Sequence, residues 1–241
     1  TVNYISTSAQ TIINGNYTNL NGTGGNRTLS NGFAVRVANV FTPGAGVYTV
    51  TGNNFEYNGT SAQTIVAMTY HNLKISNKSA IVTTSGNLVV NGELDVDPSV
   101  ILDLSTNILS GTLTTNAGTG IIRTQSTSPT PLPSGKTWAP IIQYNRALGG
   151  QTIVGGTYAK LINANTSGVN TASGTIDIID SLTLSANSDL DMSTHLLTGI
   201  GGSISGTGTL RTQNTSSVPI PRDHIWNTIT VLYNSSSAQT I

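Results

Sequence analysis

The stretch YNGTSAQTI, residues 57–65, decides the fold because it returns along the chain. Each copy has a tyrosine and, six or seven residues later, a glutamine followed by Thr-Ile. The four tyrosine–glutamine pairs are Tyr4–Gln10, Tyr57–Gln63, Tyr144–Gln151 and Tyr233–Gln239. The last three glutamines are spaced 88 residues apart, whereas the first lies only 53 residues before the second. The chain is therefore a tandem repeat with a short first copy.

A second region supports the same period. Residues 102–128 and 190–216 align without a gap, and 14 of the 27 positions are identical. Landmarks shared in this register are Arg123 with Arg211 and Trp138 with Trp226. Two such similar copies indicate a real repeat, and we expect four modules. These are a short module over 1–54, full modules over 55–141 and 142–230, and the start of the next module over 231–241.

The composition predicts an all-β fold. Thr, Ser, Asn and Gly make up 115 of the 241 residues, and all four disfavour helix interiors. Strand-like runs are short, as at 73–75, 88–90 and 120–122, and Gly, Asn, Ser and Asp separate them every few residues. No segment shows a sustained helical period.

Two β architectures fit this pattern. One is a right-handed parallel β-helix, or solenoid, in which 88 residues divide into four turns of 22. The other is a string of 88-residue β-sandwich modules, near the size of an immunoglobulin-like domain. The runs are short for a sandwich, and a 53-residue copy would lose a third of its strands. The sequence therefore favours the β-helix.

Charge and composition exclude several functional classes. Lys and Arg total 10, Asp and Glu total 10, and the formal net charge is zero. Binding to nucleic acid or to a membrane surface requires clustered positive charge, so neither partner is expected. The absence of cysteine excludes disulfides and thiolate sites. No apolar run approaches the roughly 18 residues of a membrane span.

Four motifs carry a resemblance to a known family. They are Y-N-G-x-x-A-Q-T-I-x-x-x-x-Y-x-N-L at 57–73, L-D-L-S-T at 102–106, G-T-G-x-x-R-T-Q at 118–125 and P-L-P-S-G-K-T-W at 131–138. The chain resembles the tandem Thr/Ser/Asn-rich repeats of large Bacteroidota cell-surface adhesins. Many of those proteins use type IX secretion, and some are linked to gliding. The resemblance implies an extracellular fibrous protein and identifies no ligand.

Three carboxylates alternate along one expected strand. Glu93, Asp95 and Asp97 would point to one face, where they could bind Ca²⁺ or act as acid and base. In the next copy these positions become Ser181, Thr183 and Ser185. We therefore expect an exposed acidic stripe that keeps the strand soluble, with Ca²⁺ as the weaker alternative and no enzymatic activity.

Other polar residues also have structural interpretations. Asp103 and Asp191 recur, each followed two residues later by serine, and predict turns in which the carboxylate accepts a backbone N–H bond. The three histidines, His71, His195 and His224, do not recur at matching positions. Nothing in the sequence pairs them into a zinc site.

The recurrent aromatic and basic residues have two interpretations each. Arg123 and Arg211 predict contacts between neighbouring turns, with sugar binding as the alternative. Trp138 and Trp226 predict the sealing of a loop against the core rather than a carbohydrate platform. Tyr57, Tyr144 and Tyr233 are expected to be stacked structural positions, because their spacing follows the repeat.

One serine is a candidate modification site. Asp180-Ser181-Leu182 is similar to the D-[S/T]-aliphatic motif of Bacteroidota O-glycosylation. This resemblance makes Ser181 the candidate acceptor.

The sequence predicts a structural and adhesive function. Stacked modules would form a stiff, uncharged, hydroxyl-rich rod at the cell surface. Its partners would be polysaccharide, another surface, or like chains in a filament. The alternatives are a carbohydrate-binding or carbohydrate-active β-helix and a self-assembling filament subunit. We expect no cofactor unless the acidic stripe binds Ca²⁺.

Overall fold

The computed structural model describes residues 1–79, 81–226 and 228–240, and the described residues form strands without a helix. Ile241, the last residue of the expected fourth module, lies outside this set. The chain divides into two compact units, Thr1–Ile121 and Ile122–Ile241. Each unit is an all-β parallel solenoid, and the chain has about 12 turns of about 20 residues each.

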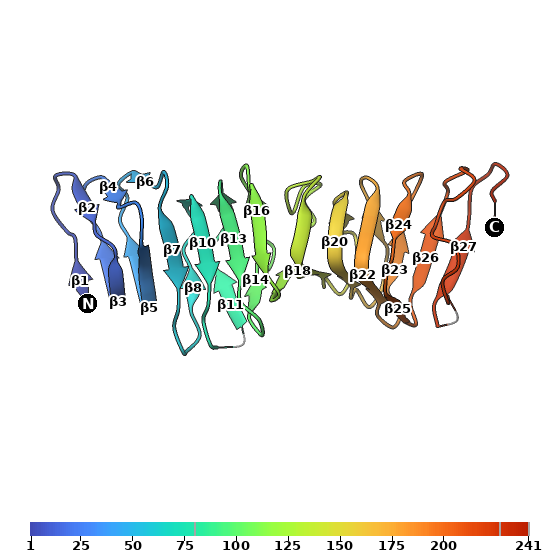
Figure 1. The fold of residues 1–241 in the computed structure, drawn as a ribbon, viewed down its shortest axis with the longest axis horizontal. Helices are drawn as coiled ribbons and strands as arrows, with labels where there is room; N and C mark the ends of the chain where they lie inside the picture. Colours follow the sequence, from blue (N-terminus) through green and yellow to red (C-terminus); the bar gives the residue numbers. More distant parts are fainter. Residues whose placement is uncertain (80, 227, 241) are drawn as a thin grey trace. The chain divides into compact units, whose positions relative to one another are not determined.

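Unit 1 contains sixteen short strands among its described residues (Figure 1). They are β1 (Val2–Asn3), β2 (Gln10–Ile12), β3 (Gly15–Gly22), β4 (Arg27–Leu29), β5 (Ala34–Pro43), β6 (Tyr48–Thr49), β7 (Asn54–Tyr57), β8 (Thr64–Ile65), β9 (Thr69–Tyr70), β10 (Asn72–Ile75), β11 (Ile81–Thr84), β12 (Leu88–Val90), β13 (Glu93–Val96), β14 (Ile101–Asp103), β15 (Leu109–Ser110) and β16 (Thr115–Gly118).

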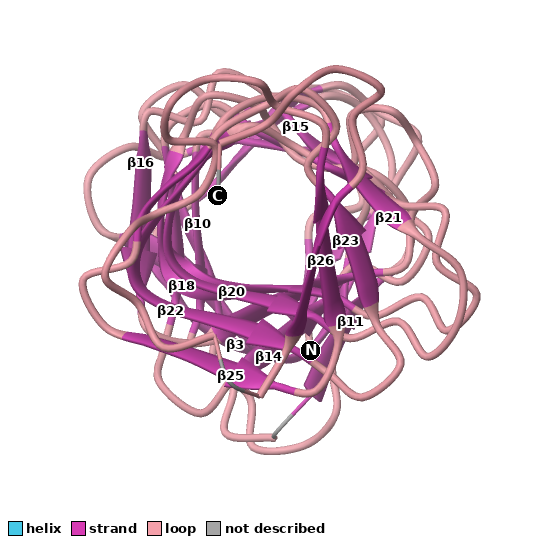
Figure 2. Cartoon of the chain, turned by 90° about the vertical axis from the view of Figure 1, so that its right-hand side faces the viewer, coloured by secondary structure: helices cyan, strands magenta, loops and turns pink. Residues whose placement is uncertain are grey.

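The strands of unit 1 form parallel ladders on three sides of a coil. One sheet has the order β1-β3-β5-β7-β10-β13-β16, and shorter ladders run β8-β11-β14 and β9-β12-β15. The chain visits β10, β11 and β12 in turn before β13 returns to pair with β10. In Figure 2, β10 and β16 lie on one side, β11 and β14 on a second, and β15 on a third.

Unit 2 is also a coil of parallel strands, and its described strands form two ladders. Its strands are β17 (Ile121–Thr124), which begins at the unit boundary, β18 (Thr137–Tyr144), β19 (Thr152–Ile153), β20 (Gly156–Asn163), β21 (Asn170–Ala172), β22 (Ile176–Leu184), β23 (Asp189–Asp191), β24 (Leu197–Gly199), β25 (Ser203–Gly206), β26 (Thr209–Thr212) and β27 (Thr230–Tyr233). β18, β20 and β22 pair in order, β24 and β25 both pair with β22, and β19-β21-β23-β26-β27 form a second ladder. All of these pairs are parallel. The parallel pairing confirms the solenoid over the sandwich.

The expected uniform turn of 22 residues is wrong, because most turns are shorter than a quarter of the sequence period. On one side of unit 2, Thr152 pairs with Thr171, Thr171 with Asp191, Asp191 with Arg211, and Arg211 with Leu232. Four turns therefore carry the chain only from Thr152 to Leu232, short of one full period. The period exceeds these four turns by more than a third of a turn. Residues one period apart along such a coil consequently fall on different sides of it.

The core follows from strict alternation along the strands. In β10, Leu73 and Ile75 are buried, whereas Asn72 and Lys74 face outward. Because the register is parallel, Leu73 stacks between Phe55 on β7 and Leu94 on β13. Each buried Leu or Ile contributes roughly 1.5–3 kcal/mol, and an isolated turn would expose this surface at both of its ends. Stability therefore comes from stacking.

The recurrent tyrosines and glutamines form the same kind of hydrogen-bonded cluster three times. In the second copy, Val66 N–H donates to the Tyr57 hydroxyl at 3.1 Å, the two hydroxyls of Tyr57 and Tyr70 lie 3.0 Å apart, and Tyr70 donates to Val66 O at 2.8 Å. We call Tyr57, Gln63 and Tyr70 the second tyrosine–glutamine cluster. The first cluster is Tyr4, Gln10 and Tyr17, and the third is Tyr144, Gln151 and Tyr158.

The glutamines connect successive turns. Gln63 accepts from Gly59 N–H and donates to Val37 O and Asn39 O, all at 2.9 Å. Gln151 and Gln239 make the equivalent three bonds at 2.8–3.3 Å. One of the two carbonyls also accepts a backbone bond, as Val37 O does from Asn58 N–H at 3.1 Å. The amide therefore adds to the backbone bonds between turns and satisfies one further carbonyl and one N–H.

Candidate functional site

The outward side chains of unit 1 form two rows across four neighbouring strands, β5, β7, β10 and β13. The strand register places Arg36, Glu56, Lys74 and Asp95 side by side in one row. A second row, two residues earlier on each strand, contains Ala34, Asn54, Asn72 and Glu93. Neighbouring strands lie about 4.8 Å apart, so the rows run across the sheet at that spacing.

The first row alternates in charge. Arg36 Nε donates to Glu56 at 2.6 Å, and Lys74 Nζ donates to Asp95 at 2.5 Å. Ser76 Oγ donates to the second oxygen of Glu56 at 2.5 Å. Each cation in the row therefore has a carboxylate partner on the next strand, which holds the side chains in fixed positions. These pairs are partly exposed, so their contribution to folding stability is small.

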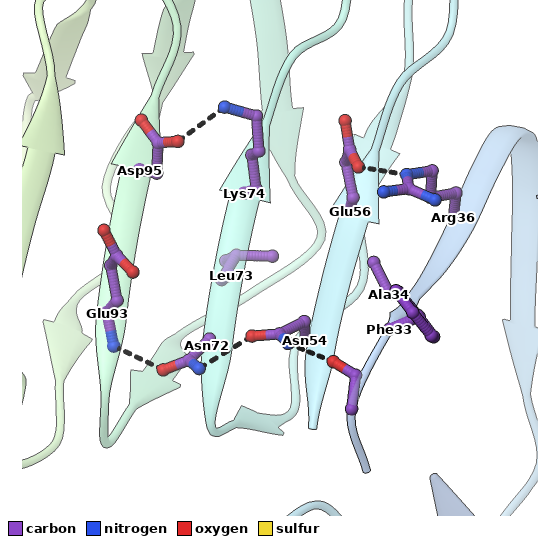
Figure 3. A pocket seen from close by; sticks show the side chains of 11 residues that line it. Phe33, Ala34, Arg36, Asn54, Glu56, Asn72, Leu73, Lys74, Glu93 and Asp95 are labelled. Atoms are coloured by element: carbon purple, nitrogen blue, oxygen red, sulfur yellow. Dashed lines mark hydrogen bonds and ion pairs between the residues drawn. The ribbon is translucent and has the colours of Figure 1, made fainter. Parts of the chain in front are cut away.

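The second row is a hydrogen-bonded asparagine ladder (Figure 3). Asn54 Nδ2 donates to Gly32 O at 2.7 Å, and Asn72 Nδ2 donates to Asn54 Oδ1 at 2.8 Å. Glu93 N–H donates to Asn72 Oδ1 at 2.8 Å and completes the ladder. Each amide thus keeps unused hydrogen-bonding capacity on its outer side.

A hollow of about 310 Å³ lies over these rows. Phe33, the residue before β5, borders the hollow with a side chain that is 83% exposed. Within the described part of the chain, the Glu93 carboxylate has no hydrogen bond or ion pair. The terminal amino groups of Arg36 are equally unengaged there, because the bond to Glu56 uses Nε. We call the surface lined by Phe33, Arg36, Asn54, Asn72 and Glu93 the outer groove.

The expected acidic stripe contains an internal cation. Lys74 Nζ bridges Asp95 at 2.5 Å and Asp97 at 2.6 Å. Burial alone would lower the pKa of Lys74, but the hydrogen bonds to these two carboxylates outweigh burial and raise it. Among the described residues, no group of three or more His, Cys, Asp or Glu side chains is placed to hold a metal ion. Ca²⁺ binding by Glu93, Asp95 and Asp97 would require displacement of the ammonium group.

A second hollow of about 630 Å³ lies in unit 2 beside Trp226. The His224 ring meets the Trp226 indole edge-on, with 6.5 Å between ring centroids. The repeat equivalent, Trp138, is fully buried on β18 because β20 covers it, with Tyr158 as its register partner. Trp138 therefore seals the core, whereas Trp226 stays half-exposed.

The recurrent Arg and Asp residues have structural positions. Arg211 Nε donates to both oxygens of Asp189 at 2.8 Å, from one turn to the next, and these bonds raise the pKa of Arg211. Arg123 lies on β17 with its side chain half-exposed. Ser105 N–H donates to Asp103 at 2.8 Å, and Ser193 N–H donates to Asp191 at 2.7 Å, which are the predicted turns.

The candidate modification site lies at an irregularity in β22. The register between β20 and β22 shifts here, and Ile179 and Asp180 are both exposed in succession. Ser181 follows them in a half-exposed, outward position, and Leu182 is buried. The Ser181 hydroxyl is therefore at the outer surface of the coil.

The other landmark residues are internal or scattered. Tyr57, Tyr144 and Gln151 are essentially buried, and Gln63 nearly so, whereas Tyr233 and Gln239 are half-exposed. His71 is in unit 1 and His195 and His224 are in unit 2. The buried clusters support the fold, so surface chemistry must come from other residues.

The sequence did not predict the outer groove. Phe33, Arg36 and Asn54 stand in no repeated motif, and Asn72 is the asparagine near the end of the motif at 57–73. Neighbouring members of each row are separated in the sequence by a full turn of the coil. Only the strand register brings them together. The charges of Arg36, Glu56, Lys74 and Asp95 alternate along the row. This alternation can be found in the sequence only if the length of each turn is known, and the turn lengths differ from one turn to the next.

Comparison with protein-family models, with curated proteins and with solved structures finds no match. Within the described ranges, no helix has the length and hydropathy needed to cross a bilayer.

Proposed function

We propose that this chain is a structural and adhesive segment of a long extracellular surface protein or filament. In this proposal the solenoid is a right-handed parallel β-helix, the hand that parallel β-strand crossovers almost always adopt. It consists of 88-residue modules, as the recurrent tyrosine–glutamine clusters support. The motifs at 57–73 and 118–125 favour a relationship between this chain and the Bacteroidota surface adhesins.

The observation that carries the proposal is the difference between the inward and the outward side chains of the coil. Inward positions hold the Ile, Leu, Val and Tyr side chains that join successive turns. Outward positions hold short hydroxyl and amide groups and a few paired charges, as β10 and β13 illustrate. Such a surface offers many hydrogen bonds and little long-range charge repulsion, which suits contact with hydroxyl-rich surfaces.

The mismatch between the period and the turn adds a geometric consequence. One period exceeds four turns by a fraction of a turn, as the ladder from Thr152 to Leu232 illustrates. In a long array built this way, equivalent outward positions of successive modules point in different directions. Such a rod presents its contact surfaces around its circumference. Adhesion would then not depend on which side of the rod meets the target.

Carbohydrate binding is the second candidate function, and the outer groove favours it. The groove combines an exposed aromatic ring with amide and carboxylate groups that have free hydrogen-bonding capacity. A catalytic role is not proposed, because the carboxylates Glu56, Asp95 and Asp97 are engaged by cations. Like chains in a filament are the alternative partner.

The proposal predicts surface exposure on the source cells. An antibody raised against this chain should label intact cells in immunogold electron microscopy, and brief protease treatment of intact cells should remove the label. An antibody against an intracellular protein serves as the control and should label only permeabilised cells. Labelling of this chain that appears only after permeabilisation would contradict extracellular placement.

A further inference from the structure

We propose that the outer groove of unit 1 is a binding subsite for a neutral oligosaccharide, with Phe33 as its stacking platform. This inference rests on the proposed adhesive function and names the chemical class of one ligand. The groove is lined by Phe33, Arg36, Asn54, Asn72 and Glu93.

An exposed aromatic ring borders the groove. Phe33 is 83% exposed, although burial would stabilise a ring of its size. The neighbouring outward residue in the second row is Ala34, whose small side chain leaves the space beside the ring open. An exposed ring beside an open space, with polar groups on one side, is suited to the apolar face of a sugar ring.

Fixed hydrogen-bonding groups lie beside the ring. Hydroxyl groups both donate and accept, so a saccharide site needs donors and acceptors together. The Glu93 carboxylate can accept, the terminal amino groups of Arg36 can donate, and the Asn54–Asn72 ladder can do both. The ion pair to Glu56 holds Arg36 in place, and the ladder fixes the amides before any ligand arrives.

The charge of the lining selects against anionic ligands. The lining contains two cations, Arg36 and Lys74, and three carboxylates, Glu56, Glu93 and Asp95. Both cations already have carboxylate partners. An anionic glycan would meet excess negative charge, and each cation of this lining is already neutralised. The charge balance therefore favours a neutral chain.

The dimensions favour an oligosaccharide over a single sugar. The rows extend over β5, β7, β10 and β13, and three strand spacings correspond to about 14 Å. Phe33 lies at the β5 end and Glu93 at the β13 end (Figure 3). A saccharide that contacts both ends must therefore contain several sugar rings.

The test is calorimetric titration of the purified chain with neutral glucan, mannan and xylan hexasaccharides, and with oligogalacturonate as the anionic probe. We expect at least one neutral hexasaccharide to bind and oligogalacturonate not to bind. Phe33→Ala should weaken that binding by about tenfold, because the stacking surface is lost. Phe33→Trp should retain it.

The matched control is Leu148→Ala, which removes another exposed apolar side chain, 69% exposed, in unit 2. Glu93→Gln keeps the shape of the groove and should weaken binding severalfold. Circular dichroism verifies that each variant is folded, and amide chemical shifts of Asn54 and Asn72 should move on ligand addition.

Three results would overturn the assignment. They are no binding of any neutral hexasaccharide, equal losses in Phe33→Ala and Leu148→Ala, and preferential binding of the anionic probe or of a cationic peptide. If one of these results is obtained while cells still display the chain and attach through it, only the assignment of the outer groove as a saccharide site is rejected. If the chain is not found on the cell surface, the proposed adhesive function, on which the groove assignment rests, is rejected instead.

Discussion

Between pH 10 and pH 12 the chain should lose most of its folding free energy. Burial raises the pKa of Tyr57 and of Tyr144 to about 12, from an ordinary value of 10.0. Burial raises the pKa of Tyr70 and Tyr158 as well. In each case the phenolate would have to form inside an apolar core that solvates a negative charge poorly.

The sign follows from proton binding. The folded pKa lies above the unfolded one, so between these values the unfolded chain has released the phenolic proton and the folded chain has kept it. The stabilisation is therefore complete below pH 10 and falls as pH rises toward 12. For each tyrosine whose pKa rises this far the loss is a few kcal/mol, so Tyr57 and Tyr144 together lose about 5 kcal/mol. A typical domain has only about 5–15 kcal/mol of stability.

The measurement is the folding free energy from urea titrations at stepped pH, followed by circular dichroism, together with tyrosinate absorbance. The absorbance of the buried tyrosines should rise together with unfolding. Replacing Tyr57 and Tyr144 by phenylalanine should make the decline with pH shallower, at some cost in stability near neutral pH. Full ionisation of all tyrosines with an intact circular dichroism spectrum would contradict the buried clusters.

Gln63→Ala should strongly destabilise unit 1. The change leaves Gly59 N–H and Asn39 O without the amide, and it also removes the bond that Asn77 Nδ2 makes to Gln63. Val37 O loses one of its two bonds and keeps the backbone bond from Asn58 N–H. Each buried group left unsatisfied costs about 1–3 kcal/mol. We expect a loss of about 3 kcal/mol or more, measured as a lower urea midpoint with an unchanged slope.

Gln10→Ala is the matched control because Gln10 occupies the same position in the first cluster of the same unit. Gln10 is half-exposed, and its side chain accepts a bond from Ser6 N–H at 3.2 Å. Its removal should cost less than about 1 kcal/mol, since water can replace that partner. Equal losses in Gln63→Ala and Gln10→Ala would show that the glutamine amide does not connect the turns.

The sequence alone was sufficient for the fold class and for several residue roles. Small polar residues between short apolar runs predict stacked parallel strands. The repeat marks the tyrosines and glutamines of the clusters, and those of the second and third copies are buried. The turns at Asp103 and Asp191 were also predictable, because an aspartate two residues before a serine satisfies its carboxylate locally. These features depend on neighbours in sequence.

Features that depend on strand register were not predictable. The turn from Gln10 to its partner Arg27 is several residues shorter than the turn from Glu93 to Thr115, because loops at the corners differ in length. A uniform turn of 22 would misplace most cross-strand neighbours. The cation that neutralises the acidic stripe, Lys74, lies 21 residues before Asp95 and was missed for this reason.

The outer groove was also not predictable from the sequence alone. Its residues come from four turns, and each one that lies on a strand has, taken alone, the pattern of an ordinary outward side chain. Phe33 precedes a strand and belongs to no repeated motif. Functional surfaces on a solenoid are assembled across turns, so they become visible only when the register is known.

The most direct test of the adhesive function is attachment of the source cells to a polysaccharide-coated surface under flow. A strain with an in-frame deletion of these 241 residues should be compared with its parent and with a complemented strain. We expect the deletion strain to be retained severalfold less and complementation to restore retention. Equal retention of parent and deletion strain, with the surface label absent from the deletion strain, would contradict an adhesive function.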